Sequence, residues 1–156
     1  MIDETDRRIL AILQEDARTP NAEIARRVGM APSAIFERVR KLEERGVVLG
    51  YEARLNPAAF GLGLVAFVFV RLEGGAADEV VERRLAEMPE VQELHHIAGE
   101  DCFLVKVRVA DAEALRRWLR EGIGGIPGVH STRTTIVLGT VKETGKLALT
   151  GEEARV

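Results

Sequence analysis

The chain has 156 residues, of which 46% are hydrophobic and 30% are charged, and its net charge at pH 7 is −3. These values are typical of one ordinary globular domain or two small ones, and they exclude wholesale disorder and collagen-like repeats. No apolar run approaches the ~18 residues that a membrane helix needs, and the polar N-terminus is unlike a signal peptide. The single cysteine, Cys102, can form no internal disulfide. We therefore expect a cytoplasmic protein that contacts no membrane.

Charge is unevenly distributed along the chain. Residues 1–50 contain equal numbers of basic and acidic side chains, whereas residues 18–45 contain seven basic and four acidic ones. A locally basic segment on an otherwise acidic chain indicates a confined anion-binding surface. The alternative is the solvated face of a helix, and charge alone does not decide between the two.

The first fifty residues predict three helices. Asp3 is a suitable N-cap for the first helix, whose apolar residues then recur at helical spacing. Pro20 begins the second helix and Gly29 ends it, while Pro32 begins the third and Gly46 ends it. Two helices joined by a short glycine-containing turn, with the second helix basic, predict a helix-turn-helix.

The organisation of the chain follows from the segments after the third helix. Residues 47–49 and 51–55 predict a strand, which Asn56-Pro57 terminates. This strand is either a wing of the helix-turn-helix or a connector. We therefore expect a helix-turn-helix DNA-binding domain over residues 1–50, a strand and linker over 51–62, a second domain over 63–149, and a tail over 150–156.

The second domain alternates strand and helix. Strands are expected over residues 63–72, 91–98, 103–109 and 129–141, and helices over 77–88 and 111–120. The order β-α-β-β-α-β is the ferredoxin-like arrangement, so the fold class is α+β. Such a sheet has one face covered by two helices and one face open. A second copy of the chain is the simplest candidate to cover the open face.

Two sets of motifs resemble one known family. The runs DETDRRILAILQEDAR, NAEIARRVGM and PSAIFERVRKLEERGVVLGYEARLNPAAFG, followed by HHIAGEDCFLVKVRVAD and IPGVHSTRTTIVLGTVKET, resemble the Lrp/AsnC (feast-famine) transcription regulators. The resemblance covers roughly residues 2–146. It implies a DNA-binding head, a hinge strand, and a ferredoxin-like domain that dimerises and often binds an amino acid. It also implies assembly beyond the dimer, often to octamers.

The sequence departs from the family pattern at the starts of two helices. The family usually has a serine at the position of Ala31, where it caps the recognition helix, and another at the position of Pro20. Loss of an N-cap side chain costs about 0.5–2 kcal/mol of helix stability. Pro32, at the first helical position, offsets part of that loss, and the free backbone N–H groups can still bind a phosphate.

The third helix is the candidate recognition helix. Periodicity places Ser33 and Arg38 on its outer face, where they could bond to base edges, while Lys41 is better placed for phosphates. The alternative for Arg38 is an ion pair with Glu37 or with a neighbouring helix. The predicted DNA-contacting residues are Arg26, Arg27, Pro32, Ser33, Ala34, Glu37, Arg38, Arg40 and Lys41.

The resemblance also indicates an effector site. The family has a glycine-aspartate loop at Gly99-Glu100-Asp101, which borders a pocket between adjacent subunits. Gly99 allows close approach of a ligand, and the carboxylates suit an ammonium group. The alternatives are a plain hairpin turn and, for the later hydroxyls, ordinary strand formers. The predicted effector-binding residues are Gly99, Glu100, Asp101, Ser131, Thr132, Thr134 and Thr135.

No catalytic or metal-binding pattern is present in the sequence. His95 and His96 are adjacent on an expected strand, so their side chains point to opposite faces and cannot share one ion. We expect no cofactor and no metal ion. The partners expected are double-stranded DNA, a small effector such as an amino acid, and further copies of the chain, as a dimer or an octamer.

Three functions from different classes are open at this stage. A DNA-binding transcription regulator modulated by a small effector is favoured. A tetrapyrrole-decarboxylase-like enzyme of related architecture and a stand-alone metabolite-binding module are the alternatives. The full helix-turn-helix argues against the module, and the absence of a His-Asn-Tyr-Arg cluster argues against the enzyme.

Overall fold

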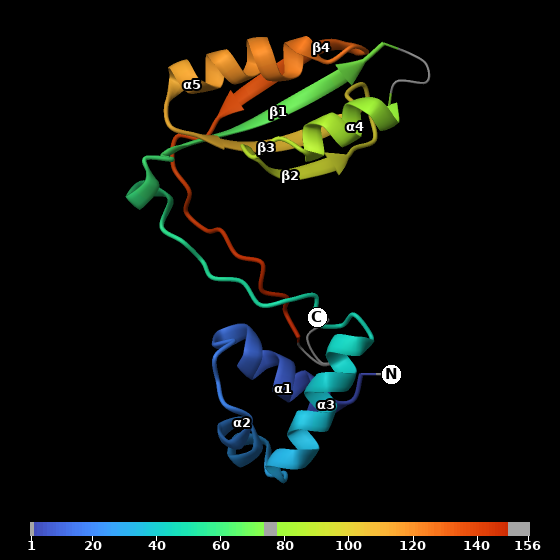
Figure 1. Ribbon diagram of the computed structural model, residues 1–156, viewed down its shortest axis with the longest axis vertical. Helices are drawn as coiled ribbons and strands as arrows, with labels where there is room; N and C mark the ends of the chain where they lie inside the picture. Colours follow the sequence, from blue (N-terminus) through green and yellow to red (C-terminus); the bar gives the residue numbers. More distant parts are fainter. Residues whose placement is uncertain (1, 74–77, 150–156) are drawn as a thin grey trace, which may run out of the picture. The chain divides into compact units, whose positions relative to one another are not determined.

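The computed structural model describes residues 2–73 and 78–149 (Figure 1). The chain divides into two compact units, one formed by residues 1–54 together with 143–156 and the other by residues 55–142. The boundary between residues 54 and 55 falls inside the predicted linker, whereas the boundary between 142 and 143 falls inside the second domain predicted over 63–149. The limits within which each part folds independently stay a prediction, and the predicted tail over 150–156 lies outside the described residues.

The first unit contains three helices, α1 (Glu4–Glu15), α2 (Asn21–Val28) and α3 (Pro32–Glu44). Each helix contributes fully buried side chains to one small core, formed by Ile9, Ile24, Ala25 and Ile35. These residues are the apolar stripes of three amphipathic helices, and burying them against one another removes their apolar surface from water. The predicted three-helix arrangement is confirmed.

The helix ends follow the local sequence. Asp3 caps α1 through a reciprocal pair with Asp6, in which the Asp6 amide donates to Asp3 Oδ1 at 2.7 Å. Gly29 ends α2 in the left-handed conformation, with φ of 82°. Neither Pro20 nor Ala31 supplies a capping side chain. Pro20 precedes the first helical residue of α2, one position from where the sequence predicted it.

The predicted strand over residues 47–49 and 51–55 is wrong. These residues are outside any sheet, since a strand needs a hydrogen-bonded neighbour and no segment among residues 2–73 and 78–149 pairs with them. Side chains hold part of the segment instead: the Tyr51 hydroxyl donates to Glu43 at 2.8 Å, and Arg54 donates to the Glu143 carbonyl at 3.0 Å. Burial and the Glu43 carboxylate raise the pKa of Tyr51 to about 12. A short 3₁₀ turn, Pro57–Phe60, follows.

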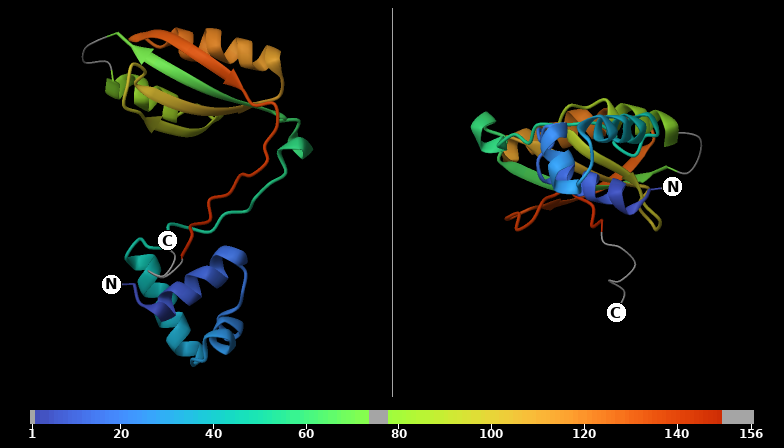
Figure 2. Two further views of the ribbon diagram at one scale, coloured as in Figure 1. Left: turned by 180° about the vertical axis from the view of Figure 1, so that it is seen from behind. Right: turned by 90° about the horizontal axis from the view of Figure 1, so that it is seen from below.

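The second unit is the predicted β-α-β-β-α-β fold. Its elements are β1 (Leu64–Leu72), α4 (Asp78–Ala86), β2 (Val91–His96), β3 (Phe103–Val109), α5 (Ala112–Arg117) and β4 (Val129–Ile136). The strands form one antiparallel sheet in the order β2-β3-β1-β4. Helices α4 and α5 lie on the same face of that sheet (Figures 1 and 2).

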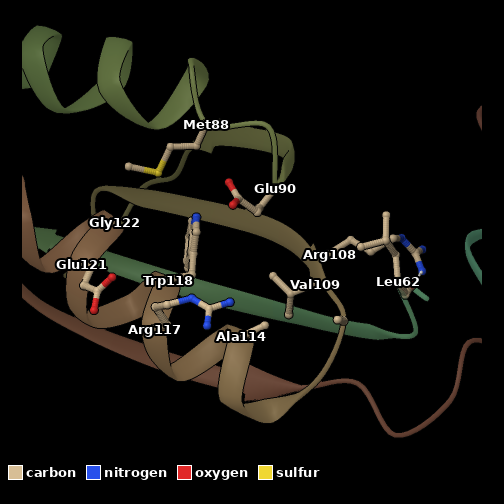
Figure 3. A pocket seen from close by; sticks show the side chains of 11 residues that line it. Leu62, Met88, Glu90, Arg108, Val109, Ala114, Arg117, Trp118, Glu121 and Gly122 are labelled. Carbon is tan, nitrogen blue, oxygen red and sulfur yellow. Dashed lines mark hydrogen bonds between the residues drawn. The ribbon is translucent and has the colours of Figure 1, made fainter. Parts of the chain in front are cut away.

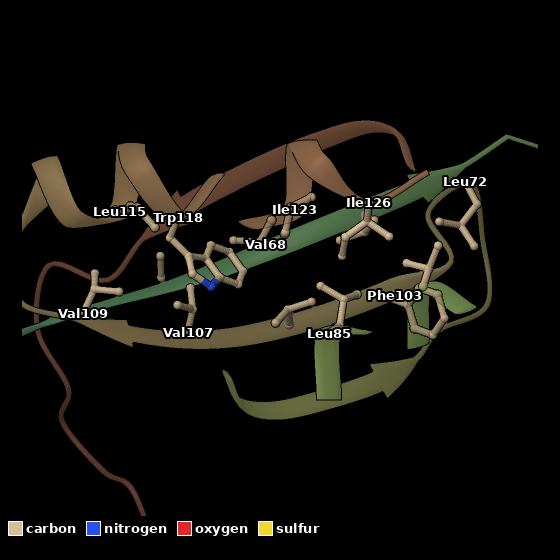
Figure 4. Close-up of a cluster of buried hydrophobic side chains, with 14 residues drawn as sticks. Val68, Leu72, Leu85, Phe103, Val107, Val109, Leu115, Trp118, Ile123 and Ile126 are labelled. Carbon is tan, nitrogen blue, oxygen red and sulfur yellow. The ribbon is translucent and has the colours of Figure 1, made fainter. Parts of the chain in front are cut away.

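The core of the second unit lies between the sheet and these helices (Figure 4). Alternate residues of β1 and β3 point into it, which gives β3 a regular pattern of buried and half-buried positions. Val81 and Leu85 from α4 meet them, as do Leu115 and Trp118 on the other helix. The core fixes the register of the sheet, because a shift by one residue would turn these side chains to the opposite face.

Several elements are shorter than predicted: β1 begins at Leu64, β2 ends at His96, and α4 ends at Ala86, before the expected end at residue 88. The two largest differences are in β4 and α5. Strand β4 ends at Ile136 and not at Val141, because its neighbour β1 begins at Leu64 and offers no further partner beyond Val137. Helix α5 ends at Arg117 and continues as a wider π turn over Trp118–Gly122. The predicted cap of α5 is confirmed, since Asp111 accepts from the Ala114 amide at 2.8 Å.

Candidate DNA and effector sites

The connection from α2 to α3 leaves the start of α3 uncovered. Gly29 turns the chain, Ala31 adopts an extended conformation, and Pro32 is the first helical residue. Pro32 and Ser33 are exposed, and no side chain caps the first amides of the helix. Uncapped N–H groups at a helix N-terminus form an anion-binding position. The end of α3 that a recognition helix presents to DNA is therefore free of side-chain hydrogen bonds.

The exposed face of α3 carries both signs of charge. Arg40 donates to Glu37 at 2.9 Å and also pairs with Glu44, so its guanidinium is held between two carboxylates of its own helix. Lys41 is exposed and makes no hydrogen bond or ion pair to the residues that the structure describes. Of the predicted phosphate-contacting residues on α3, Lys41 is therefore the one available without breaking an existing contact.

Arg38 lies in a different place from the one that periodicity suggested. Its guanidinium Nη1 donates to Asp3 Oδ2 and to Asp6 Oδ1, both at 2.7 Å, and so joins α3 to the first turn of α1. The Asp6 side chain is only 9% exposed. This arrangement matches the alternative in which Arg38 pairs with a neighbouring helix. To contact a base as predicted, the Arg38 side chain would have to leave its partly buried ion pair with Asp3 and Asp6.

The two arginines of α2 are also paired. Glu23 accepts from Arg26 and from Arg27, at 2.8 and 2.7 Å, and these guanidiniums lower the pKa of its carboxyl to about 2. Both arginines are exposed, so the pairs contribute little to stability. Their consequence is electrostatic, because one carboxylate offsets part of the positive charge that DNA would meet at α2.

Replacing Glu23 with glutamine should strengthen DNA binding. The change releases two guanidiniums, and each one that reaches a phosphate steepens the dependence of log K on log[salt] by about 0.9. We expect tighter binding at low salt and a slope steeper by about 1 to 2, measured by fluorescence anisotropy over a salt series. Glu113→Gln is the matched control, since Glu113 pairs with Arg116 in the same way in the second unit. Binding by Glu23→Gln that is no tighter than that of the wild type at any salt concentration would contradict this prediction.

The loop at Gly99 lies between β2 and β3, and its carboxylates are already paired. Glu100 accepts from Arg71, while Asp101 accepts from Arg133 at 3.2 Å and lies 3.9 Å from the Arg71 Nε. Asp101 is 21% exposed and Glu100 is 88% exposed. Gly99 has φ of 137°, a conformation that favours glycine. A ligand ammonium group at this loop would therefore compete with two arginines.

The hydroxyls predicted on the last strand divide between two faces. Ser131 pairs with Arg71 and Thr135 with Phe67, so both lie on the face that carries no helix, which we call the open face. Thr132 and Thr134 alternate with them and lie on the helix-covered face. The structure brings Ser131 to the same face as the loop's arginine partners and does not bring Thr132 or Thr134 there.

Sequence reasoning missed Arg71 and Arg133 as members of this site. The sequence feature that could have identified them is an arginine at a strand position on the open face, because a charge there needs either solvent or an ion-pair partner. The Arg133 guanidinium also lies 3.9 Å from the centre of the Phe69 ring, in a cation–π contact. These arginines link β1 and β4 to the loop.

The open face carries both apolar and charged side chains. Phe67, Phe69 and Leu104 are half-buried along its middle, and an ion pair of 2.9 Å between Lys106 and Glu93 lies beside them. Strand positions on this face therefore alternate between apolar and charged side chains across the sheet. A partner for this face would have to match charges as well as apolar surface.

The histidines form separate pairs. His96 lies 2.8 Å from Glu82 and its ring contacts Phe103, whereas His95 lies 3.3 Å from Glu93 on the open face. Across residues 2–73 and 78–149, no group of three or more potential metal ligands is found. Within the same residues, no helix has the length and apolar character needed to cross a membrane.

The comparisons with known proteins agree in both halves of the chain. Residues 2–43 match the AsnC-type helix-turn-helix domain, and residues 65–147 match the Lrp/AsnC ligand binding domain. The leucine-responsive regulatory protein of Escherichia coli (strain K12) is 40% identical over 150 residues, covering 95% of this chain and 92% of that protein.

Solved structures show the same likeness. A transcriptional regulator of Neisseria meningitidis, crystallised with L-methionine, is 32% identical with a TM-score of 0.91, over 96% of this chain and 97% of that one. The feast or famine regulatory protein of M. tuberculosis, also crystallised with L-methionine, is 38% identical with a TM-score of 0.87. That match covers 94% of this chain and 99% of that one. The family is one of transcription regulators, which rules out both the enzyme and the stand-alone module. The chain belongs to the Lrp/AsnC family and is a DNA-binding transcription regulator.

Proposed function

We propose that the regulator reads double-stranded DNA with the N-terminal half of α3 and that an amino acid modulates its binding. The observation that carries this proposal is the presence, in one chain, of an AsnC-type helix-turn-helix and an Lrp/AsnC ligand binding domain. The base-reading residues are those at the start of α3, Ser33, Ala34 and Glu37. Pro32 has no N–H, so the first amide of this helix that can bind a phosphate is that of Ser33. Arg38 is not among them, because Asp3 and Asp6 hold its guanidinium.

Phosphate contacts are assigned to the side chains that flank this helix end. Lys41 is already available, while Arg26, Arg27 and Arg40 must exchange a glutamate for a phosphate oxygen. Such contacts supply affinity without sequence information.

Lys41→Ala is the variant that tests this assignment. It should weaken the binding of all sequences alike and reduce the salt slope by about 1, measured by anisotropy with specific and with scrambled duplexes. Lys142→Ala removes the same charge from the second unit and should leave the slope unchanged. An equal effect of the two variants would show that Lys41 acts only through net charge.

The effector site is proposed at the Gly99 loop, at a contact between subunits. Two relatives carry L-methionine in their crystals, which supports an amino acid as the class of ligand. A ligand that displaces the ion pairs of this loop could place its ammonium group against Asp101 and its carboxylate against Arg71 and Arg133. Ser131 lies on the same face and can add a hydroxyl contact. We retain Thr132 and Thr134 only as strand formers.

Self-association is the remaining part of the proposal. The open face holds three half-buried apolar side chains and no covering helix among the described residues, so a second copy is the proposed occupant. A two-fold dimer presents two copies of α3 and therefore binds a site with two related halves, one helical turn or more apart. The proposal includes octamers as assemblies of such dimers.

A further inference from the structure

A cavity of about 380 Å³ lies in the second unit, far along the sheet from the Gly99 loop (Figure 3). The loop joins the end of β2 to the start of β3, whereas the cavity lies at the start of β2 and the end of β3, beside α5. It is also on the helix-covered face. The residues of its wall that matter here are Met88, Glu90, Val109, Ala114, Arg117 and Trp118.

Three polar groups around this cavity have no hydrogen-bonding or ion-pair partner within the part of the chain that the structure describes. The indole Nε1 of Trp118 is buried and donates to nothing, although Trp118 is only 6% exposed. The half-buried Glu90 carboxylate makes no hydrogen bond or ion pair with the described residues, and the exposed Arg117 has only a longer-range interaction with Glu113. Buried polar groups are nearly always paired, so an orphaned donor at a cavity indicates a missing acceptor.

The three groups differ in charge, and apolar side chains lie between them. An indole N–H and a guanidinium suit a carboxylate, and the Glu90 carboxylate suits an ammonium group. Val109, Ala114 and Met88 supply apolar surface in the same wall. We propose that this cavity is a second small-molecule site, which takes a small zwitterion carrying an apolar group. The site is separate from the one proposed at the Gly99 loop and does not depend on it.

The environment of Gly122 shows how a ligand would reach the indole. A Cβ at Gly122 would lie 3.5 Å from the Trp118 Nε1 and 3.6 Å from the Met88 sulfur, so the thioether and the N–H lie on the same side of the cavity. Methionine has three rotatable bonds and moves readily, and its sulfur is a weak acceptor. A ligand carboxylate can therefore displace the Met88 side chain and take its place beside the indole.

Trp118 is the chain's one tryptophan, so its fluorescence reports directly on this cavity. We would titrate the whole 156-residue chain with each apolar L-amino acid. For the amino acid that binds most tightly, we would then titrate two analogues, one that lacks the carboxylate and one that lacks the ammonium group. At least one amino acid should change the Trp118 emission saturably, and both analogues should bind at least tenfold more weakly. No saturable change with any of them would overturn the proposal.

Variants separate this cavity from the loop. Gly122→Leu fills the cavity and should abolish the change, whereas Gly122→Ala makes only ordinary contacts and should retain it. Glu90→Gln should weaken binding about tenfold without altering the fold, and the exposed Glu87→Gln is its control. Gly99→Val should leave the signal intact. A signal that survives both Gly122→Leu and Glu90→Gln, or that disappears in Gly99→Val, would place the ligand elsewhere.

Discussion

Arg38→Ala is expected to lower the free energy of unfolding of the first unit by about 1–3 kcal/mol. The magnitude is that of a lost hydrogen bond to a buried charged group, here Oδ1 of the Asp6 carboxylate, whose side chain is 9% exposed and whose Oδ2 keeps only the Asp3 amide. The variant also loses the connection between α3 and the first turn of α1. Loss of the helical circular-dichroism signal before the change in Trp118 emission would assign the destabilisation to the first unit.

Lowering the pH should reduce the destabilisation that Arg38→Ala causes. The Asp6 amide and the Arg38 guanidinium lower the pKa of Asp3 below its ordinary value of 3.8. A carboxylate with a lowered pKa stabilises the fold above its ordinary pKa and loses that contribution as the pH falls through the folded-state pKa. The stability difference between wild type and Arg38→Ala should therefore be complete at neutral pH and shrink below about pH 4.

Arg40→Ala is the matched control for Arg38→Ala. Its two glutamate partners are exposed on α3, and exposed pairs contribute little to stability, so Arg40→Ala should unfold much like the wild type. The contrary outcome is an Arg38→Ala variant with the same free energy of unfolding as Arg40→Ala and a lost preference for one base. That result would show that Arg38 contacts DNA directly and that its pair with Asp3 and Asp6 is dispensable for stability.

An amino acid that binds the assembled second unit is expected to raise its stability by about 2.7 kcal/mol at a hundredfold excess over the dissociation constant. A melting screen over the twenty amino acids measures this. We expect one or a few to raise the melting temperature of wild type, and Gly99→Val to abolish the rise while still binding DNA. No atom lies within 4 Å of a Cβ at Gly99, so the variant acts through backbone strain at φ of 137°.

The control for Gly99→Val is Gly139→Val, at a position with equal space and no left-handed backbone. It should keep the ligand-induced rise. A rise that persists in Gly99→Val would place the effector away from this loop, and no rise with any amino acid would show that the effector belongs to another chemical class.

The sequence predicts the fold well where periodicity and caps determine it. The three helices, the β-α-β-β-α-β order and the caps at Asp3 and Asp111 all depend on local patterns that the structure reproduces. Strand ends are harder to predict, because they depend on a partner. Strand β4 ends opposite the start of β1, and residues 51–55 pair with no strand in the described part of the chain although their composition favours a strand.

The candidate sites are predicted less completely, for a different reason. A helical wheel places Arg38 toward solvent, but it cannot show that Asp3 and Asp6 approach from 32 to 35 residues away. Alternation correctly divides the hydroxyls of β4 between two faces, yet which face meets the loop at Gly99 follows only from the pairing with β1. Contacts between distant segments therefore decide which predicted residues remain available to a ligand.

Selection of genomic DNA fragments by the purified protein, with and without each amino acid, tests the central claim most directly. The account predicts an enriched sequence motif with two related halves, one helical turn or more apart, and enrichment that changes in the presence of at least one amino acid. Enrichment of no sequence over bulk DNA, or a motif whose recovery is the same with all twenty amino acids and with none, would contradict it.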